Sequence, residues 1–303
     1  MTELAFYTLD VFTDRIFGGN QLAVFPDAPE LETAVMQSIA REFNLSETVF
    51  VRPSQKEGAL RRLRIFTPGA ELPFAGHPTV GTAQLLVELG IAPLGANGGS
   101  RFAFEEGVGL VPIEVTRAQD GGYFTWLTAA RIPERGPAVP PRDVLAALLG
   151  LGVDEVIEND EDAPCGYSAG VPFLFIPLRD REALRRATLD LVRWRESIEN
   201  FWAQDVYVFC HDATSAPVDV HARMFAPAMG IGEDPATGGA AAAFGGYLWS
   251  RAGRGGRWLI SQGEDMGRPS TLHVEVAGES GALRSVRVGG SAVRVSRGTM
   301  QVP

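Results

Sequence analysis

The stretch Gly232-Glu233-Asp234-Pro235-Ala236-Thr237-Gly238-Gly239 introduces the segment of the sequence that decides the fold. No charged residue occurs from Pro235 to Ser250. Asp234 is a residue type that caps helices, and proline is tolerated at the first helical position, so we predict a helix from Pro235. Its glycines each cost roughly 1 kcal/mol of helix propensity, so the rest of a domain must surround it. The run is shorter than the about 20 apolar residues that span a bilayer.

The same construction occurs earlier in the chain. Arg64–Pro68 leads through a short loop into Gly76–Ala83, just as Arg223–Pro227 leads into Asp234–Ala240. Each unit has a strand, a proline, a loop, a proline at the expected helix start and then small residues. A repeat of half the chain predicts two similar domains, each with strands curled about one apolar helix. The alternative is chance similarity between two strand–loop–helix units.

Composition narrows the class of protein. A chain of 303 residues can hold two domains with separate cores. Its net charge of −10 argues against a nucleic-acid binder. Cys165 and Cys210 have neither metal-type spacing nor a disulfide framework. Met1 to Asp10 contains charges and strand-like alternation, so no signal peptide is expected, and a cytoplasmic protein without membrane contact is the default.

Hydrophobic periodicity indicates the other elements. We expect helices at residues 31–43, 78–89 and 142–149, and a linker near the domain boundary at 133–141. The segment 171–178 contains Pro172 and Pro177, which favours an edge strand. The remaining strands are expected at residues 4–11, 22–25, 46–51, 60–66, 102–104, 108–115, 123–127, 206–209, 218–225 and 258–261, with three or four short ones between 271 and 302.

Several standard catalytic signatures are absent from the sequence. It has no P-loop, no G-x-G-x-x-G and no H-E-x-x-H. Gly166-Tyr167-Ser168-Ala169-Gly170 matches the nucleophile elbow of serine hydrolases, but that motif needs a preceding strand and a following helix. An acidic loop precedes it here and a proline-containing strand follows, so a serine hydrolase is disfavoured.

Glu47, His77 and Asp234 are the candidate catalytic residues. Alone, Glu47 fits a solvated charge at a strand end, His77 a helix cap, and Asp234 an N-cap. Together the three residues indicate a ligand site, because helix N-termini attract carboxylates and two such helix ends can share a cleft between domains. An acid or base in that cleft could move a proton beside a bound carboxylate. Asn20 follows the turn Phe17-Gly18-Gly19, which is either a plain hairpin connection or a way to present an amide to a ligand.

These residues belong to motifs that resemble the PhzF family of phenazine biosynthesis, which is related in fold to diaminopimelate epimerase. The resemblance covers nearly the whole chain. It is carried by Asn44–Thr48, Arg64–Pro68, Glu71–Thr79 and Glu233–Gly238, and also by Gly19-Asn20, Gln262-Gly263, Gly267–Ser270 and Arg297–Thr299.

The resemblance implies an α+β fold of two pseudo-symmetric β-rolls, each around a central helix. The domains would be 1–120 and 121–289, with a last strand at about 290–303 returning to the first. It also implies a homodimer and a proton-moving isomerase of a small cyclic amino acid or related carboxylate, without cofactor or metal. In it Glu47 is the general acid and base, and His77 and Asp234 assist. The implied substrate-binding residues are Asn20, Gly76, Thr79, Thr237, Gly238 and Gly239.

Gly239 departs from the family pattern. Phenazine-forming members have a serine after the Thr-Gly of this motif, so a hydroxyl donor is missing here. This leaves open a protein that binds a small ligand on the same scaffold without converting it. The two-cysteine mechanism of the epimerase relatives is disfavoured, because Cys165 and Cys210 lie away from His77 and Asp234.

Overall fold

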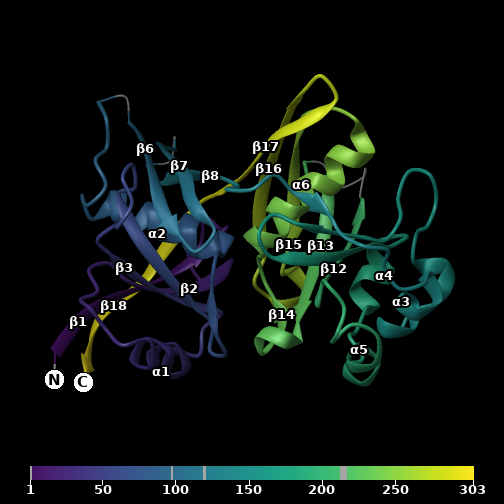
Figure 1. The fold of residues 1–303 in the computed structure, drawn as a ribbon, viewed down its shortest axis with the longest axis horizontal. Coiled ribbons are helices and arrows are strands. Elements are labelled where there is room, and N and C mark those ends of the chain that lie inside the picture. The colour runs from purple at the N-terminus through teal and green to yellow at the C-terminus, as the bar shows by residue number, and fades with distance from the viewer. Residues whose placement is uncertain (1, 97, 119–120, 212–216) are drawn as a thin grey trace.

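Two apolar helices form the centres of the two halves of the molecule (Figure 1). The structure is a computed structural model that describes residues 2–96, 98–118, 121–211 and 217–303. Helix α2 (Gly76–Glu88) is buried from Gly76 to Val87. Helix α6 (Gly238–Ala252) is buried at ten of its positions between Gly238 and Leu248. As the small residues and glycines predict, strands cover both helices on nearly all sides.

The strands around α2 come mainly from the first part of the chain. Parallel β2 and β3 start at the same edge, with Leu22 opposite Glu47. Helix α1 (Thr33–Phe43) packs outside this sheet with an aromatic cluster that includes Phe25, Phe43 and Phe50. The strands are β1 (Thr2–Val11), β2 (Asn20–Phe25), β3 (Glu47–Arg52), β4 (Arg61–Phe66), β5 (Glu71–Leu72), β6 (Gly99–Glu106), β7 (Gly109–Arg117) and β8 (Tyr123–Thr128).

The strands around α6 come from the second part, with three short helices outside them. The helices are α3 (Arg142–Leu148), α4 (Arg181–Arg186) and α5 (Leu191–Ser197). The strands are β9 (Glu134–Arg135), β10 (Cys165–Ser168), β11 (Pro172–Pro177), β12 (Asp205–His211), β13 (Val220–Ala226), β14 (Ile231–Asp234), β15 (Gly256–Gln262), β16 (Ser270–Glu279) and β17 (Ala282–Gly290). The 3₁₀ turns are Val153–Glu155, Pro227–Met229 and Glu264–Met266.

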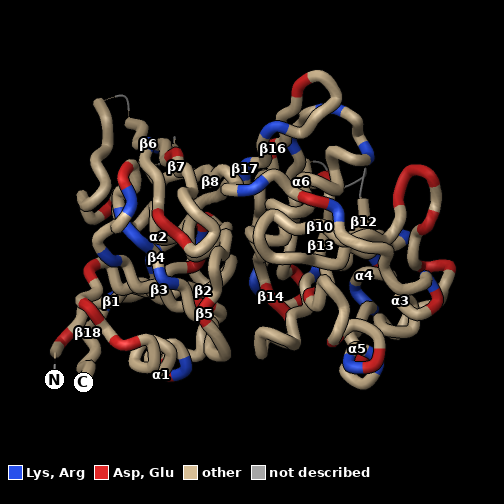
Figure 2. The backbone as a smooth tube through the Cα atoms, in the orientation of Figure 1, with Lys and Arg blue, Asp and Glu red and all other residues tan. Residues whose placement is uncertain are grey.

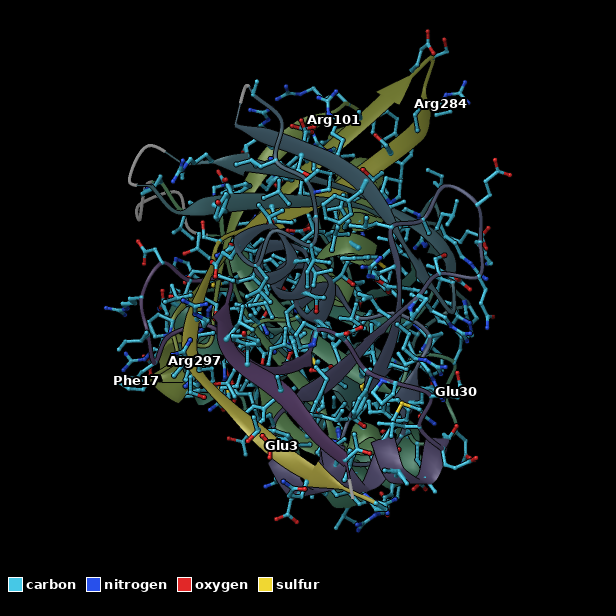
Figure 3. All side chains as sticks on the ribbon, turned by 90° about the vertical axis from the view of Figure 1, so that its left-hand side faces the viewer. Glu3, Phe17, Glu30, Arg101, Arg284 and Arg297 are labelled. Carbon is cyan, nitrogen blue, oxygen red and sulfur yellow. The ribbon has the colours of Figure 1, made fainter. Side chains whose placement is uncertain are left out.

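Two ladders join the halves. Strand β17 pairs antiparallel with β8, from Arg287 opposite Thr128 to Gly290 opposite Thr125. The last strand, β18 (Ala292–Val302), then crosses to pair with β1 over its whole length. Strands β1 and β18 appear in Figure 3, which looks onto the first half and labels Glu3 of β1 and Arg297 of β18. The two termini therefore lie side by side.

The N-terminal ends of α2 and α6 touch through backbone. A Cβ atom built on Gly76 would lie 2.4 Å from the carbonyl carbon of Gly238, and one built on Gly238 would lie 2.8 Å from the Cα of Gly76. Only glycine allows this approach. The two helix ends expected to face one cleft are therefore in direct contact.

The expected helix starts are wrong by a few residues. Helix α2 begins at Gly76 rather than Pro78, so His77 lies inside its first turn. Helix α6 begins at Gly238, with Thr237 at the N-cap position, and Asp234 ends strand β14 instead of capping the helix. The reason is side-chain bonding, because Asp234 accepts hydrogen bonds from the side chains of Asn20 and Thr237.

The expected edge strand at 171–178 is also wrong. Strand β11 lies between β10 and β12, and its two prolines stand at its first and last positions, where a missing N–H is tolerated. The tail forms three strands, β16 to β18, that are long rather than short.

Basic and acidic residues alternate over both halves in the view of Figure 2. Among the described helices, none has the length and apolar character needed to cross a membrane.

Candidate active site

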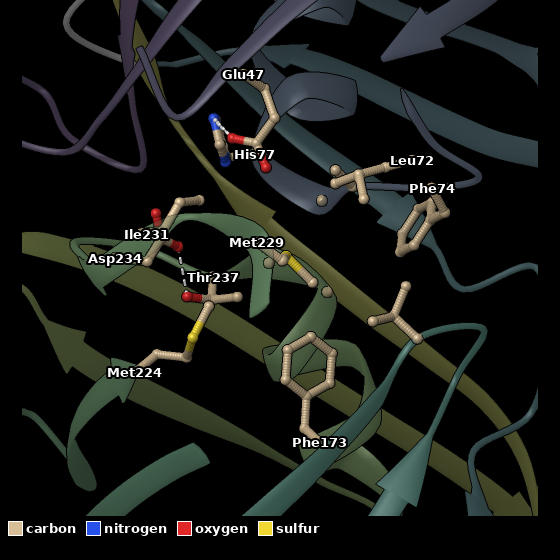
Figure 4. A pocket seen from close by; sticks show the side chains of 15 residues that line it. Glu47, Leu72, Phe74, His77, Phe173, Met224, Met229, Ile231, Asp234 and Thr237 are labelled. Atoms are coloured by element: carbon tan, nitrogen blue, oxygen red, sulfur yellow. Dashed lines mark hydrogen bonds and ion pairs between the residues drawn. The ribbon is translucent and has the colours of Figure 1, made fainter. Parts of the chain in front are cut away.

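A cavity lies where the two helix ends meet (Figure 4). Glu47 and His77 approach it from the first half, and Asp234 and Thr237 from the second. Gly76, Gly238 and Gly239, which the resemblance implies as substrate-binding residues, also line it. Most of the remaining lining is apolar and includes Leu72, Phe74, Phe173, Met224, Met229 and Ile231.

Glu47 and His77 form a buried pair. Glu47 is the first residue of β3, and its Oε2 lies 3.1 Å from Nε2 of His77. Glu47 is 7% exposed and His77 3% exposed. Figure 4 shows both side chains turned toward one another at the top of the cavity. The two atoms face each other at this distance without forming a hydrogen bond, and both side chains reach the cavity.

The protonation of this pair follows from its burial. Burial, followed by the negative charge of Asp234, raises the pKa of Glu47 well above its ordinary value. Burial lowers the pKa of His77 to about 3, although a hydrogen bond with the backbone of Gln21 acts to raise it. At neutral pH the imidazole is therefore uncharged, and burial shifts Glu47 toward its protonated form. A carboxyl whose pKa is raised toward neutrality is suited to accept and return protons.

Asp234 is a carboxylate held by hydrogen bonds. Its Oδ1 accepts from Asn20 Nδ2 at 2.7 Å, and its Oδ2 accepts from Thr237 Oγ1 at 2.6 Å. Its backbone carbonyl accepts from Gln262 Nε2 at 2.8 Å. Burial raises its pKa to about 6, although the bonds from Thr237 and Asn20 oppose that shift. At pH 7 Asp234 is therefore mostly charged.

Asn20 bridges the two halves without lining the cavity. Its Nδ2 lies 3.2 Å from His77 Nδ1 and donates at 2.9 Å to the carbonyl of Ala236, in addition to its bond to Asp234. The side chain is fully buried. Thr79, also expected to bind substrate, is turned away, with its hydroxyl 2.7 Å from both the Ala75 carbonyl and Glu106 Oε1.

Two buried carboxyl groups near the site were not anticipated from the sequence. Burial raises the pKa of Glu106 to about 8, and its partner is Thr79. Burial, followed by the charge of Asp234, raises the pKa of Asp205 to about 7. Each is an acidic residue at one end of a strand, which is also where solvated charges occur, so the sequence carries no signal for them. Within the described ranges, no three or more His, Cys, Asp or Glu side chains are grouped as metal ligands.

Solved structures and curated relatives agree on the class of this protein. The Bacillus anthracis phenazine biosynthesis protein of the PhzF family superposes with a TM-score of 0.87, at 25% identity over 100% of both chains. A Mesorhizobium japonicum protein named an uncharacterised isomerase is 42% identical and is covered over 96% of both chains. The predicted α+β fold and the predicted enzyme class, an isomerase, are confirmed.

The family follows from a match along almost the entire chain. Residues 9–298 match the model of the PhzC-PhzF family, described as phenazine biosynthesis-like protein. A trans-2,3-dihydro-3-hydroxyanthranilate isomerase of Pseudomonas fluorescens is 35% identical over 96% of this chain and 97% of its own length. This chain belongs to the PhzC-PhzF family.

Proposed function

We propose that the protein moves a proton between two carbons of a small cyclic amino acid or related carboxylate, with Glu47 as general acid and base. The observation that carries this proposal is the buried contact between Glu47 and His77, made inside a cavity where two helix N-termini meet. The cavity lies between the two halves, which is a common position for small-molecule sites. Its apolar walls suit the body of a ring, and its polar groups lie around the helix ends.

The proposed reaction needs no net change in the protein. In its ionised form Glu47 takes a proton from one carbon, and the electron pair of the broken C–H bond moves into the conjugated system of the substrate. The protonated carboxyl then gives the proton to the second carbon, and Glu47 is ionised again. Helix N–H groups beside the substrate carboxylate stabilise the negative charge that develops in between.

The two partner residues have different proposed roles. His77 stays uncharged and exchanges a hydrogen bond with Glu47 as its proton comes and goes. Asp234 remains charged at neutral pH and holds the substrate from the opposite wall. Thr237 and the backbone of Gly76, Gly238 and Gly239 complete the substrate contacts in this proposal.

The test is hydrogen exchange with solvent. We expect the protein, incubated in deuterium oxide with trans-2,3-dihydro-3-hydroxyanthranilate or other cyclic amino acids, to convert one of them with a gain of one mass unit at one carbon. Mass spectrometry measures the gain. Glu47→Gln should abolish it, whereas Glu106→Gln, a change at an equally buried glutamate outside the cavity, should leave it intact.

A ligand-binding protein without catalysis is the second candidate. Gly239 favours it, because a glycine there offers no hydroxyl to a ligand in the cavity. A molecule that binds in the cavity but is neither converted nor exchanged would support this alternative and contradict the first.

The assembly and the domain limits are also proposals. Of the proposed division into 1–120 and 121–289, the return of about 290–303 to the first domain is supported by the pairing of β18 with β1, whereas β8 (Tyr123–Thr128) packs around α2 with the first half. We propose a homodimer because of the family resemblance, and a cytoplasmic location because of the charged stretch at Met1 to Asp10; light scattering on the purified protein measures the mass of the assembly.

A further inference from the structure

Arg268 connects a loop of the second half to a turn of the first half. Its Nε donates to the carbonyl of Gly19 at 2.8 Å, and its Nη2 donates to the carbonyl of Gly18 at 2.6 Å. The same Nη2 forms an ion pair with Asp10 Oδ1 at 2.5 Å. One guanidinium therefore holds two consecutive backbone carbonyls and a carboxylate that is 4% exposed.

The turn that Arg268 holds is fixed from other directions as well. The backbone N–H of Phe17 donates to Asp10 Oδ2 at 2.6 Å, and the N–H of Gly19 donates to the Pro269 carbonyl at 3.1 Å. Gly19 has a φ of 60°, and a Cβ atom there would lie 2.3 Å from the Val11 carbonyl oxygen. Phe17 lies at the edge of the molecule in Figure 3, where it is labelled. The carbonyls of the turn thus face inward, toward Arg268.

Asn20 is the next residue after this turn. Its Nδ2 donates to Oδ1 of Asp234 and to the carbonyl of Ala236, and it lies 3.2 Å from Nδ1 of His77. A rotated amide would place Oδ1 of Asn20 against the carboxylate of Asp234, which is repulsive. The contact therefore depends on the position and orientation of one side chain, and both are set by the backbone of the turn.

We propose that Arg268 is a positioning residue that, through the turn and Asn20, keeps His77 and Asp234 in their working geometry. Arg268 is absent from the cavity lining, so it acts on the site only through other residues. Its fork shape matters, because a lysine carries the same charge but cannot donate to both carbonyls and to Asp10 in this arrangement. The effect of Arg268 on turnover rests on the proposed function. The effect of Arg268 on the position of Asn20 does not.

The first measurement uses Arg268→Lys and needs no substrate. The chain has five asparagines, so selective ¹⁵N labelling of asparagine gives a simple side-chain amide spectrum. The two side-chain amide signals of Asn20 are assigned as the pair that is missing from the spectrum of the Asn20→Asp variant. We expect Arg268→Lys to shift the Asn20 amide signals and to speed their exchange with water. Unchanged Asn20 signals in a folded Arg268→Lys protein would overturn the inference.

The second measurement follows conversion of trans-2,3-dihydro-3-hydroxyanthranilate and its deuterium gain. A displacement of about 1 Å in a catalytic group can cost roughly 10²-fold, so we expect kcat to fall about 10- to 100-fold with little change in KM. If the wild type shows no conversion while the Asn20 signals still move, the positioning role stands and the proposed function fails. Equal kcat in the wild type and in Arg268→Lys would overturn the positioning role of Arg268 but leave the proposed function standing.

Arg287→Lys is the matched control. Arg287 forms an ion pair with Glu114 of β7 at 2.6 Å, so it also connects the halves, and its exposed fraction of 25% is close to the 20% of Arg268. This variant should leave the Asn20 signals and kcat unchanged. Should Arg268→Lys fail to fold, Asp10→Asn removes the same ion pair with a smaller change, and the same two measurements apply to it.

Discussion

The N-terminal ends of α2 and α6 meet at one point but carry different chemistry. At the start of α2, His77 lies within the first helical turn and faces Glu47 at 3.1 Å. At the start of α6, the acidic residue Asp234 lies four positions before the helix and is held by Asn20 and Thr237. Burial favours an uncharged pair on the first side, whereas hydrogen bonds keep the second side mostly ionised at pH 7.

The difference suggests how a repeated scaffold supports an asymmetric reaction. Both halves provide a helix end and a glycine at the contact, which are the symmetric parts of the structure. We infer that the first half supplies the group that carries the proton, and that the second half supplies a fixed charge. Changes to the two sides should therefore produce different kinetic effects.

Glu47→Gln should have the largest effect. It keeps the shape of the side chain but removes the carboxyl that accepts and returns the proton. We expect kcat to fall by roughly 10²- to 10⁴-fold, with ligand binding and folding nearly unchanged. His77→Ala should cost less, because His77 assists Glu47. Steady-state kinetics with calorimetric ligand binding measures both, and normal turnover in Glu47→Gln would mean that Glu47 is not the acid–base group.

Asp234→Asn should have a smaller effect that depends on pH. Because its pKa is about 6, lowering the pH through 6 neutralises Asp234 in the wild type and should reduce kcat/KM. The variant should lack that acidic limb and be about 10- to 100-fold slower at pH 7.5, as expected for a lost hydrogen bond to a charged group. A wild-type profile that stays flat from pH 7 to pH 5 would contradict this role.

The carboxyl of Asp234 affects the stability of the fold in the opposite direction: lowering the pH, which should reduce kcat/KM, should increase the free energy of unfolding. Its pKa is about 6 in the folded protein, above the roughly 3.9 of an unfolded aspartate, so the folded state binds the proton more tightly. Stability from this group is therefore present below pH 4 and is lost as the pH rises through 6. Asp234→Asn should gain stability relative to the wild type as the pH rises, as measured by urea unfolding at pH 4 and pH 8.

Gly76→Ala tests the contact between the helix ends. The new methyl group would lie 2.4 Å from the Gly238 carbonyl carbon, so the helices must separate. We expect a loss of about 1–3 kcal/mol in the free energy of unfolding, as for other overpacked sites. Urea denaturation measures it, and an unchanged unfolding midpoint would show that the helix ends can part freely.

Gly239→Ser should have the smallest effect on stability and is the matched change to Gly76→Ala. A Cβ at Gly239 would meet only the Phe173 ring, at 3.7 Å, so we expect a change within about 0.5 kcal/mol. The new hydroxyl would reach the cavity that Gly239 lines. We expect faster conversion of trans-2,3-dihydro-3-hydroxyanthranilate, measured as kcat/KM, and a decrease would show that Gly239 suits the natural substrate better.

The sequence was enough to predict the two halves and most of the polar residues that line the cavity, because both depend on short motifs of neighbouring residues. Runs of small residues predicted the buried helices, and the repeat predicted that their ends meet. It misplaced Asp234 as a helix cap, because the bonds that Asp234 makes come from Asn20, 214 residues away. It could not find Asp205 or Arg268 as parts of the site environment, since their partners are set by tertiary contacts rather than by neighbours in the chain.

The most direct test of the account follows the proton itself. A substrate deuterated at the carbon that loses its hydrogen is converted in ordinary water, and mass spectrometry locates deuterium in the product. Because Glu47 is only 7% exposed, we expect part of the deuterium to appear at the second carbon. Glu47→Gln should lose both conversion and transfer. Equal conversion with the same deuterium transfer in Glu47→Gln would contradict the claim that Glu47 carries the proton.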